Sequence, residues 1–251
     1  MKITVTRIAL VATLAGILYV PLSGAVQLNQ SWRNADQSSA GFAPSPAVSQ
    51  EAVVQVYVAR VVRWRGIFAV HPWVSIKPKG ADAYTVYQVL GWRARRNQLV
   101  VVANEDVPDR HWFGNKPDLL VDLRGAAAEA VIDPVLKAIE SYPFADSYSQ
   151  WPGPNSNTFI AHIGRQVPGL RLNLPATAIG KDYLGKTSFV AKAPSGTGYQ
   201  LSLFGLFGVL LAWEEGLEIN VLTFNLGFNP FKLHAKFPFI GSAGITLPEE
   251  K

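Results

Sequence analysis

The stretch WPGPNSNTFIAHI, residues 151–163, places a small hydroxyl side chain where a turn gives way to a helix. Two prolines and a glycine stiffen the turn, and the apolar residues that follow recur at helical spacing. Asn155 or Ser156 is therefore expected at the helix N-cap, where a side-chain oxygen accepts hydrogen bonds from the first amides. Two interpretations of Ser156 stay open: a cap without chemistry, or a nucleophile at the mouth of the helix.

A nucleophilic serine needs a base, and the chain has four histidines. His71 stands in the middle of a predicted strand, where an ionisable ring normally needs a reason. His111 lies in a loop beside Trp112 and could line a pocket. His162 and His234 are expected to pack against neighbours or to face solvent. His71 is therefore the candidate general base.

Two further groups would complete a catalytic site. Gln88 is a polar residue among the apolar neighbours of the next predicted strand, and it could orient the imidazole. A neutral amide does not stabilise an imidazolium as a carboxylate does, so Gln88 is the weak point of this arrangement. The amides of Asn157 and Thr158 are expected to hold the charge that develops on a substrate oxygen. The residues expected to bind a ligand are Asn155, Asn157, Thr158, Trp73 and His111.

The elements that must position these residues are strands first and helices later. Valine-rich, alternating runs predict strands over residues 52–62, 67–76, 84–92 and 99–103. Turn signals such as Lys79-Gly80 separate them, and four consecutive strands favour an antiparallel meander. Helical spacing follows over residues 126–142, where Asp133-Pro134 is expected to restart the helix.

The last third of the chain is read more coarsely. Residues 201–213 are apolar with two glycines, which favours a buried strand over a membrane-apposed surface, and residues 219–226 predict another strand. The predicted fold class is α+β, with a mainly antiparallel sheet packed by helices.

The N-terminus has the pattern of a targeting signal. Lys2 and Arg7 precede an apolar run over residues 8–20, and small residues up to Ala25 follow, as is typical of a secretory signal. The run is short for a membrane-spanning helix, which needs ~20 apolar residues, and an uncleaved anchor is the alternative. Either interpretation exports the chain, as a periplasmic or membrane-anchored protein. The predicted organisation is a signal peptide or anchor over 1–25, a polar linker over 26–50 and one globular domain over 51–251.

Composition excludes several classes of function. The 251 residues are 49% hydrophobic, enough for one good core, and contain no cysteine, which excludes disulfides and thiolate chemistry. The net charge of +5 is scattered, and the arginines of residues 93–96 lack interleaved aromatics, so no nucleic-acid partner is expected. The glutamates of residues 214–218 lack a histidine at ligand spacing, so neither a metal nor a cofactor is expected.

The order of these residues resembles the permuted papain-like fold of lecithin retinol acyltransferase-like amidases and acyltransferases. In that fold a strand histidine precedes a nucleophilic cysteine at a helix mouth, in an Asn-Cys segment followed by an aromatic. The NSNTF of this chain has Ser156 in that place. The resemblance implies His71 as general base and Gln88 as the orienting residue. Unlike a cysteine, a serine gains little acidity from a helix terminus and needs an aligned base.

Longer motifs spread along the chain are similar to a bacterial family known as domain of unknown function 3750. These motifs are WRNADQSSAGFAP, VVQVYVAR, WRGIFAVHPWVSIKP, YTVYQVLGWR, WPGPNSNTF, LPATAIGKDY and PSGTGYQ. This resemblance implies a membrane-associated envelope protein and brings no established activity. Two functions stay open: a degenerate, noncatalytic binding or structural module, or a serine-dependent amidase, esterase or acyltransferase acting on peptidoglycan peptides or lipid. The expected partner is a cell-envelope or membrane component, or a small-molecule, peptide or lipid substrate.

Overall fold

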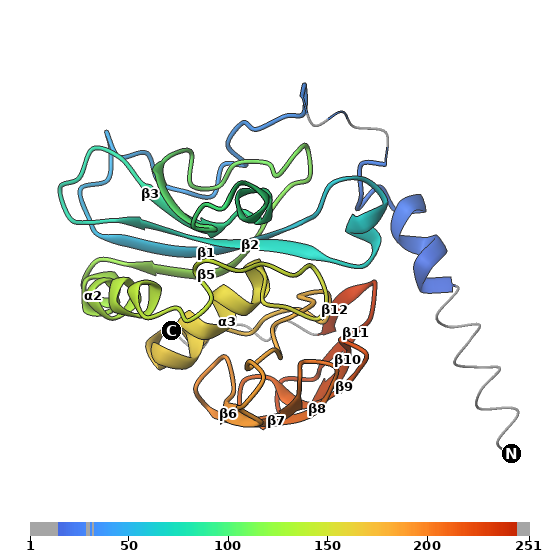
Figure 1. Ribbon diagram of the computed structural model, residues 1–251. Helices are drawn as coiled ribbons and strands as arrows, with labels where there is room; N and C mark the ends of the chain where they lie inside the picture. Colours follow the sequence, from blue (N-terminus) through green and yellow to red (C-terminus); the bar gives the residue numbers. More distant parts are fainter. Residues whose placement is uncertain (1–14, 29–30, 32, 245–251) are drawn as a thin grey trace, which may run out of the picture.

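Two antiparallel sheets and the helices beside them make up the fold (Figure 1). The computed structural model describes residues 15–28, 31 and 33–244. A five-stranded sheet comes from the first half of the chain, and a seven-stranded sheet follows the last long helix. The predicted α+β class with antiparallel pairing is confirmed, although the structure has two sheets where one was expected.

The five-stranded sheet has the order β4-β3-β2-β1-β5. Its strands are β1 (Val53–Arg60), β2 (Val70–Lys77), β3 (Thr85–Val89), β4 (Val101–Glu105) and β5 (Asp118–Arg124). The first four pair antiparallel in chain order, so the predicted meander is confirmed. β5, which the sequence did not predict, returns to the free edge of β1.

The first half of β2 lacks a neighbour on the β3 side. β2 begins at Val70, later than predicted, because Arg63–Ile67 forms the short 3₁₀ helix η1. β3 pairs with β2 only over residues 74–76. Pro72, which cannot donate a hydrogen bond to a sheet, lies in this half, which pairs with β1 but not with β3. At the level of His71, therefore, β2 and β3 are not paired through their backbones.

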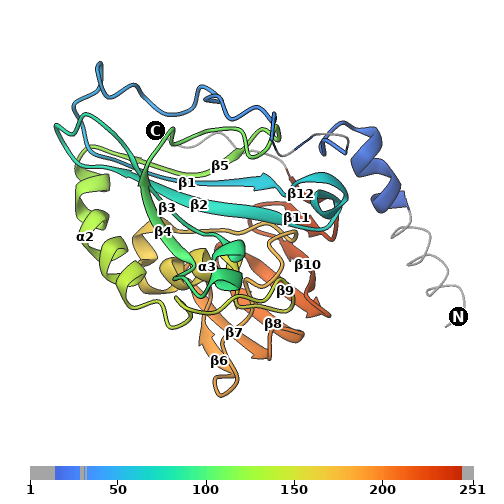
Figure 2. The ribbon, with the colours of Figure 1, turned by 45° about the horizontal axis from the view of Figure 1, so that its top comes forward.

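Two helices cover one face of this sheet (Figure 2). They are α2 (Ala126–Glu140) and α3 (Ser156–Gln166), accompanied by the 3₁₀ helices η2 (Gly91–Arg96) and η3 (Pro168–Leu170). α2 runs through Pro134 without a break, so the predicted restart at Asp133 is wrong. The buried face formed by Val131, Val135 and Ala138 continues across the proline, and this packing keeps the helix intact.

The seven-stranded sheet is a meander in chain order. Its strands are β6 (Val190–Lys192), β7 (Gly198–Leu203), β8 (Phe207–Ala212), β9 (Gly216–Val221), β10 (Phe224–Asn229), β11 (His234–Phe237) and β12 (Gly241–Gly244). The single strand predicted over 201–213 is a hairpin of β7 and β8, and that over 219–226 divides between β9 and β10. Phe204 and Leu222, both with positive φ, lie in the two turns.

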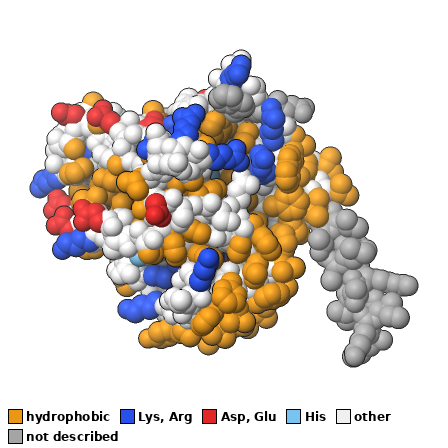
Figure 3. All heavy atoms as spheres, in the orientation of Figure 1, with side chains coloured by type: hydrophobic (Ala, Val, Ile, Leu, Met, Phe, Trp, Pro, Cys, Tyr) orange, Lys and Arg blue, Asp and Glu red, His pale blue; other side chains and the backbone are white. Residues whose placement is uncertain are grey.

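This second sheet has its polar face inward and its apolar face outward. The inward side chains of β7 to β11 include buried Gln200, Ser202, Glu218, Asn220, Asn225 and Lys236. We call the opposite side the outer face; its exposed side chains are Tyr199, Leu201, Leu203, Phe207, Val209, Leu211, Leu217, Ile219, Val221, Leu226 and Phe228. Figure 3 shows hydrophobic side chains gathered over the lower right of the molecule, where Figure 1 draws β8 to β12.

A buried ion network holds the polar face against the rest of the protein. The Glu218 carboxylate accepts hydrogen bonds from the ammonium groups of Lys181, at 2.6 Å, and Lys236. Burial acts to raise the pKa of Glu218, but the two ammonium charges outweigh it and lower this pKa to about 2. Arg165 on α3 donates to the side chain of Gln200 at 2.8 Å. Charged and polar contacts thus attach the second sheet to α3.

Residues 15–22 are helical and lie beside the end of the second sheet. Val20 of this segment is buried in a cluster with Phe239, against which Phe68 also packs. In the part of the chain that the structure describes, no helix is long and apolar enough to cross a membrane. Residues 1–14, which carry the first part of the predicted apolar run, lie outside the described residues.

The segment predicted as a polar linker lies along the five-stranded sheet. The Asp109 carboxylate accepts hydrogen bonds from the Ser39 hydroxyl at 2.8 Å and from the Phe42 amide at 2.6 Å. Phe42 also packs on Tyr57 of β1. These contacts fix this part of the segment against the sheet.

Candidate functional site

A cleft of about 1060 Å³ opens where the first half of β2, which does not pair with β3, meets the start of α3. η1, η2 and the loop before α3 complete its walls. The residues that line it include His71, Asn155, Ser156, Asn157, Trp64 and Trp151. The predicted base and the predicted nucleophile therefore share one cleft.

His71 is a buried, neutral imidazole with a fixed tautomer. Its Nε2 lies 3.0 Å from Gln88 Oε1, and because an amide oxygen only accepts, Nε2 carries the proton. The lone pair is thus on Nδ1. The ring stacks on Trp112, with centroids 3.9 Å apart and 12° between the planes. Burial lowers the pKa of His71 to about 4, against the opposing hydrogen bond to Gln88. At neutral pH the ring is therefore unprotonated at Nδ1, which forms no hydrogen bond with the residues that the structure describes.

Asn155, and not Ser156, is the N-cap of α3. The Oδ1 atom of Asn155 accepts hydrogen bonds from the amides of Asn157, at 2.9 Å, and Thr158, at 3.2 Å. The Thr158 hydroxyl oxygen in turn accepts from the Asn155 amide at 3.1 Å. This reciprocal capping box satisfies the donors that a helix start leaves open. Ser156 is left as the first helical residue.

Two glycines make room for this cap, which accounts for part of the turn sequence. Gly153 has φ 138°, and a Cβ there would lie 2.9 Å from Tyr183 Cβ. Gly180 has φ 94°, and a Cβ there would lie 2.3 Å from Asn155 Nδ2. Both positions thus need a glycine. The turn encloses Asn155, whose Nδ2 group donates to two backbone carbonyls nearby.

The described residues leave both hydrogen-bond donors of Ser156 unengaged. Its amide and its hydroxyl form no hydrogen bond with any other residue that the structure describes. The side chain faces the cleft, and the helix N-terminus around it favours negative charge. The amides of Asn157 and Thr158, expected to stabilise an oxyanion, are engaged by Asn155 instead. The Ser156 amide is the donor that remains at the helix mouth.

Asn157 joins α3 to β2 next to both candidate residues. Its Nδ2 group donates to the carbonyls of Val70, at 3.2 Å, and Ile179, at 2.8 Å. Val70 precedes His71 in the chain, and Asn157 follows Ser156. Asn157 therefore positions the helix mouth beside the histidine, a role that the sequence analysis did not assign to it.

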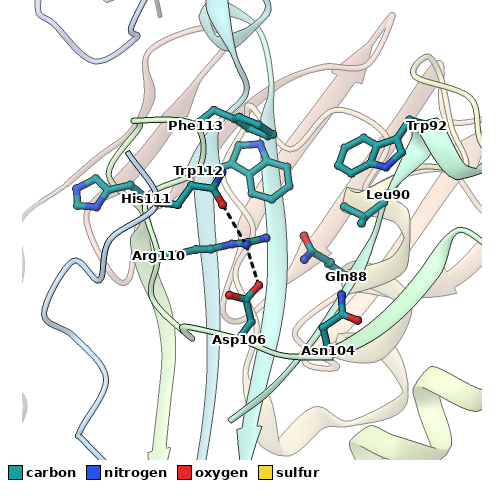
Figure 4. Close-up of a pocket in the computed structure, with 10 residues that line it drawn as sticks. Gln88, Leu90, Trp92, Asn104, Asp106, Arg110, His111, Trp112 and Phe113 are labelled. Carbon is teal, nitrogen blue, oxygen red and sulfur yellow. Dashed lines mark hydrogen bonds and ion pairs between the residues drawn. The ribbon is translucent and has the colours of Figure 1, made fainter. Parts of the chain in front are cut away.

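Trp73 and His111 lie apart from the cleft wall. Trp73 is buried in the sheet, and its Nε1 donates to a backbone carbonyl at 2.7 Å. His111 Nδ1 lies 2.9 Å from the Ser38 carbonyl oxygen, and the residue lines a second pocket of about 230 Å³. Trp112 and Gln88 contribute to this smaller pocket as well (Figure 4).

Trp112 belongs to the candidate site and was not predicted from the sequence. It covers one face of the His71 ring and lines both the cleft and the smaller pocket, where Figure 4 shows it beside the Arg110–Asp106 ion pair of 2.7 Å. Its only sequence signal was its place next to His111. Among the described residues, no group of three His, Asp or Glu side chains is arranged to hold a metal ion.

One comparison with known proteins finds a match. A family model described as "Protein of unknown function (DUF3750)" matches residues 51–183, just over half of the chain. The matched part holds β1 to β5, α2, α3 and every residue that lines the cleft, whereas the seven-stranded sheet lies beyond it. No curated protein and no solved structure matches the chain.

Proposed function

We propose that this chain, which belongs to the family of proteins of unknown function DUF3750, is a serine-dependent acyl hydrolase or acyltransferase of permuted papain-like type. Ser156 is the nucleophile and His71 the general base, and Gln88 orients the base. The substrate class is an ester or amide of the cell envelope, in a peptidoglycan peptide or a lipid.

The observation that carries the proposal is that Ser156 and His71 line one cleft, and that neither the Ser156 hydroxyl nor His71 Nδ1 forms a hydrogen bond with the described residues. Because Asn155 caps the helix, the Ser156 hydroxyl is not needed as a cap. The hydrogen bond to Gln88 places the proton of His71 on Nε2 and leaves the lone pair on Nδ1. During attack the Ser156 hydroxyl proton passes to Nδ1 while Oγ bonds to the substrate carbonyl carbon. The carbonyl oxygen gains the negative charge, and the Ser156 amide and the helix N-terminus stabilise it.

Completing the cycle needs the same residues. The imidazolium returns its proton to the leaving alcohol or amine as the carbonyl re-forms, which leaves an acyl ester on Ser156. A water molecule then releases the acid, or an acceptor alcohol or amine takes the acyl group, with His71 again accepting the proton. The buried ring and its neutral partner make the imidazolium costly, so slower turnover is expected than with a carboxylate partner.

The rim of the cleft suits a substrate with apolar and acidic parts. Trp64, Trp92 and Trp151 are each about half exposed there, and Arg65 and Arg95 stand among them. Exposed indole rings provide apolar contact area with a polar edge, and the guanidinium groups suit carboxylates or phosphates.

The low pKa of His71 favours a second candidate, a noncatalytic binding module. An imidazole that resists protonation is a poor general base, but it can still form part of the binding surface for a ligand. In that case the cleft binds an envelope component, and Ser156 contributes only a hydroxyl contact. In both cases the N-terminal apolar run exports the chain.

The variant Ser156→Cys tests the base without a known substrate. The natural chain has no cysteine, so each variant carries a single thiol. We measure the pH dependence of alkylation and compare it with Ser188→Cys, whose site is exposed. A free thiol has a pKa of about 8.5, and burial alone would raise it. The active-site proposal expects a clearly lower value at position 156, which His71→Ala returns to the control value or above. A thiol at 156 with a pKa at or above the control from the outset refutes the catalytic role and favours the binding module.

A further inference from the structure

The outer face of the seven-stranded sheet is apolar at every outward position from Tyr199 on β7 to Phe228 on β10. These side chains are each about half exposed or more. Side chains of this size present roughly 50–100 Å² each when half exposed, so the face amounts to on the order of 1,000 Å². Apolar patches on soluble monomers reach only about 300–600 Å². The outer face is thus too large and too uniform to be ordinary surface.

The second sheet cannot bury its outer face by packing that face, in place of its polar face, against the rest of the protein. Its other side carries Glu218 and Lys236, which form the buried ion network with Lys181, and Asn220, which donates to the Asp182 carboxylate. Exposing those charges would leave the polar surface of α3 and residues 171–183 without partners. The alternation of polar and apolar residues therefore assigns one face to the protein interior and leaves the other for an apolar partner.

The N-terminal apolar segment lies at the end of this same sheet. A Cβ at Gly16 would lie 3.6 Å from the Phe239 ring and 3.7 Å from the Ile240 side chain, in the turn between β11 and β12. Leu18 and Leu22 of the segment are 63% and 85% exposed. Residues 15–22 therefore lie at one end of the sheet, and Figure 3 shows exposed apolar side chains of this segment next to those of the sheet.

From these observations we propose that the outer face docks onto a lipid bilayer, in the membrane that receives the N-terminal segment. Two apolar surfaces that meet at one end of the molecule fit a single lipid plane. The stacked Trp213 and Phe231, with centroids 4.7 Å apart and both more than half exposed, extend the face at its margin. Aromatic rings favour the boundary between lipid and water. A second copy of the chain would cover the sheet but would leave Leu18 and Leu22 in water.

Docking also orients the cleft. Trp151 on the cleft rim donates from Nε1 to the Thr223 hydroxyl at 3.0 Å, in the turn between β9 and β10. Leu222 in the same turn is 46% exposed. The rim thus lies at the border of the outer face. The docking proposal stands apart from the proposed chemistry, because it does not depend on His71 or Ser156.

Single cysteines in the full chain test the proposal. Leu211→Cys on the outer face and Leu99→Cys at the five-stranded sheet replace leucines of similar exposure, 67% and 61%. Each variant is labelled with an environment-sensitive fluorophore and bound to phosphatidylcholine vesicles that contain a spin-labelled lipid. The fluorophore at position 211 is expected to shift to the blue and to be quenched by the lipid label, and that at position 99 to remain in water.

Three outcomes separate the occupants of the face. Quenching at 211 alone supports the bilayer. An unquenched label at 211 in chains that float with the vesicles overturns the proposal, because the N-terminal segment then binds without the sheet. A blue shift at 211 without vesicles, together with a 211–211 disulfide between copies, assigns the face to a second copy and also overturns it. As a second measurement, Leu211→Lys combined with Ile219→Lys is expected to weaken vesicle binding at least tenfold, and Leu99→Lys to leave it unchanged.

Discussion

Asn155→Ala and Ser156→Ala are adjacent substitutions that should differ sharply in their effect on stability. The Asn155 side chain is buried and makes four hydrogen bonds with backbone groups at the start of α3, two with helix amides and two with carbonyls. Ser156 makes none through its side chain with the described residues. If Ser156 is free for chemistry, alanine there should be tolerated.

The magnitude follows from these contacts. Loss of an N-cap costs about 1 kcal/mol. Each lost hydrogen bond to a partly buried backbone carbonyl costs ~0.5–1.5 kcal/mol more, because the Ile179 carbonyl keeps its hydrogen bond from Asn157. Asn155→Ala should therefore lower the free energy of unfolding by about 2 kcal/mol or more. Ser156→Ala removes no partner, and alanine has the higher helix propensity, so its effect should stay within ~0.5 kcal/mol.

Urea unfolding followed by tryptophan fluorescence measures both effects. With a slope of about 1–3 kcal/mol/M, a loss of 2 kcal/mol moves the midpoint by roughly 0.7 M or more. Ser156→Ala should keep the natural midpoint. If Ser156→Ala loses 1 kcal/mol or more, or as much as Asn155→Ala, then Ser156 shares the capping role and the case for a free nucleophile fails.

Two further predictions concern buried charges. Burial lowers the pKa of His71 from its ordinary 6.5 to about 4. As the pH falls, the imidazole is therefore protonated in the unfolded chain before it is protonated in the folded protein. The contribution of the neutral imidazole to stability is complete above pH 6.5 and is lost as the pH falls toward 4. In unfolding measurements the natural chain should lose roughly 3 kcal/mol more than His71→Gln over this range, and equal losses would contradict a buried neutral ring. Glu218→Gln takes the carboxylate from the buried ammonium group of Lys236 and leaves that of Lys181 with Asp182 alone, and should cost ~3–5 kcal/mol. The exposed Glu140→Gln should change stability by less than ~0.5 kcal/mol, and a similar small effect at position 218 would rule out the network as a source of stability.

Four strands of the first sheet and the start of α3 could be predicted because their signals are local. Alternating valines identify β1, and the Asn-Ser pair after a stiff turn identifies the helix start. Which of Asn155 and Ser156 is the cap could not be predicted, since both residues are good caps and Gly180, which makes room for the asparagine, lies far away in sequence.

The second sheet was harder to predict for a different physical reason. Alternation shows that a strand has two unlike faces but not which one is buried, and here the polar face is inside. Its turns are filled by Phe204 and Leu222, which look like strand residues in the sequence. Trp112 was missed because its stacking on His71 joins a loop to a strand.

The central claim is that His71 activates Ser156, and labelling with a fluorophosphonate tests it most directly. Such a probe phosphonylates a serine whose proton a base removes, and peptide mass spectrometry locates the adduct. We predict one adduct, on Ser156, that disappears in Ser156→Ala and falls at least tenfold in His71→Ala while the fold persists. An unlabelled natural chain, or a Ser156 adduct whose rate does not change in His71→Ala, would contradict the claim.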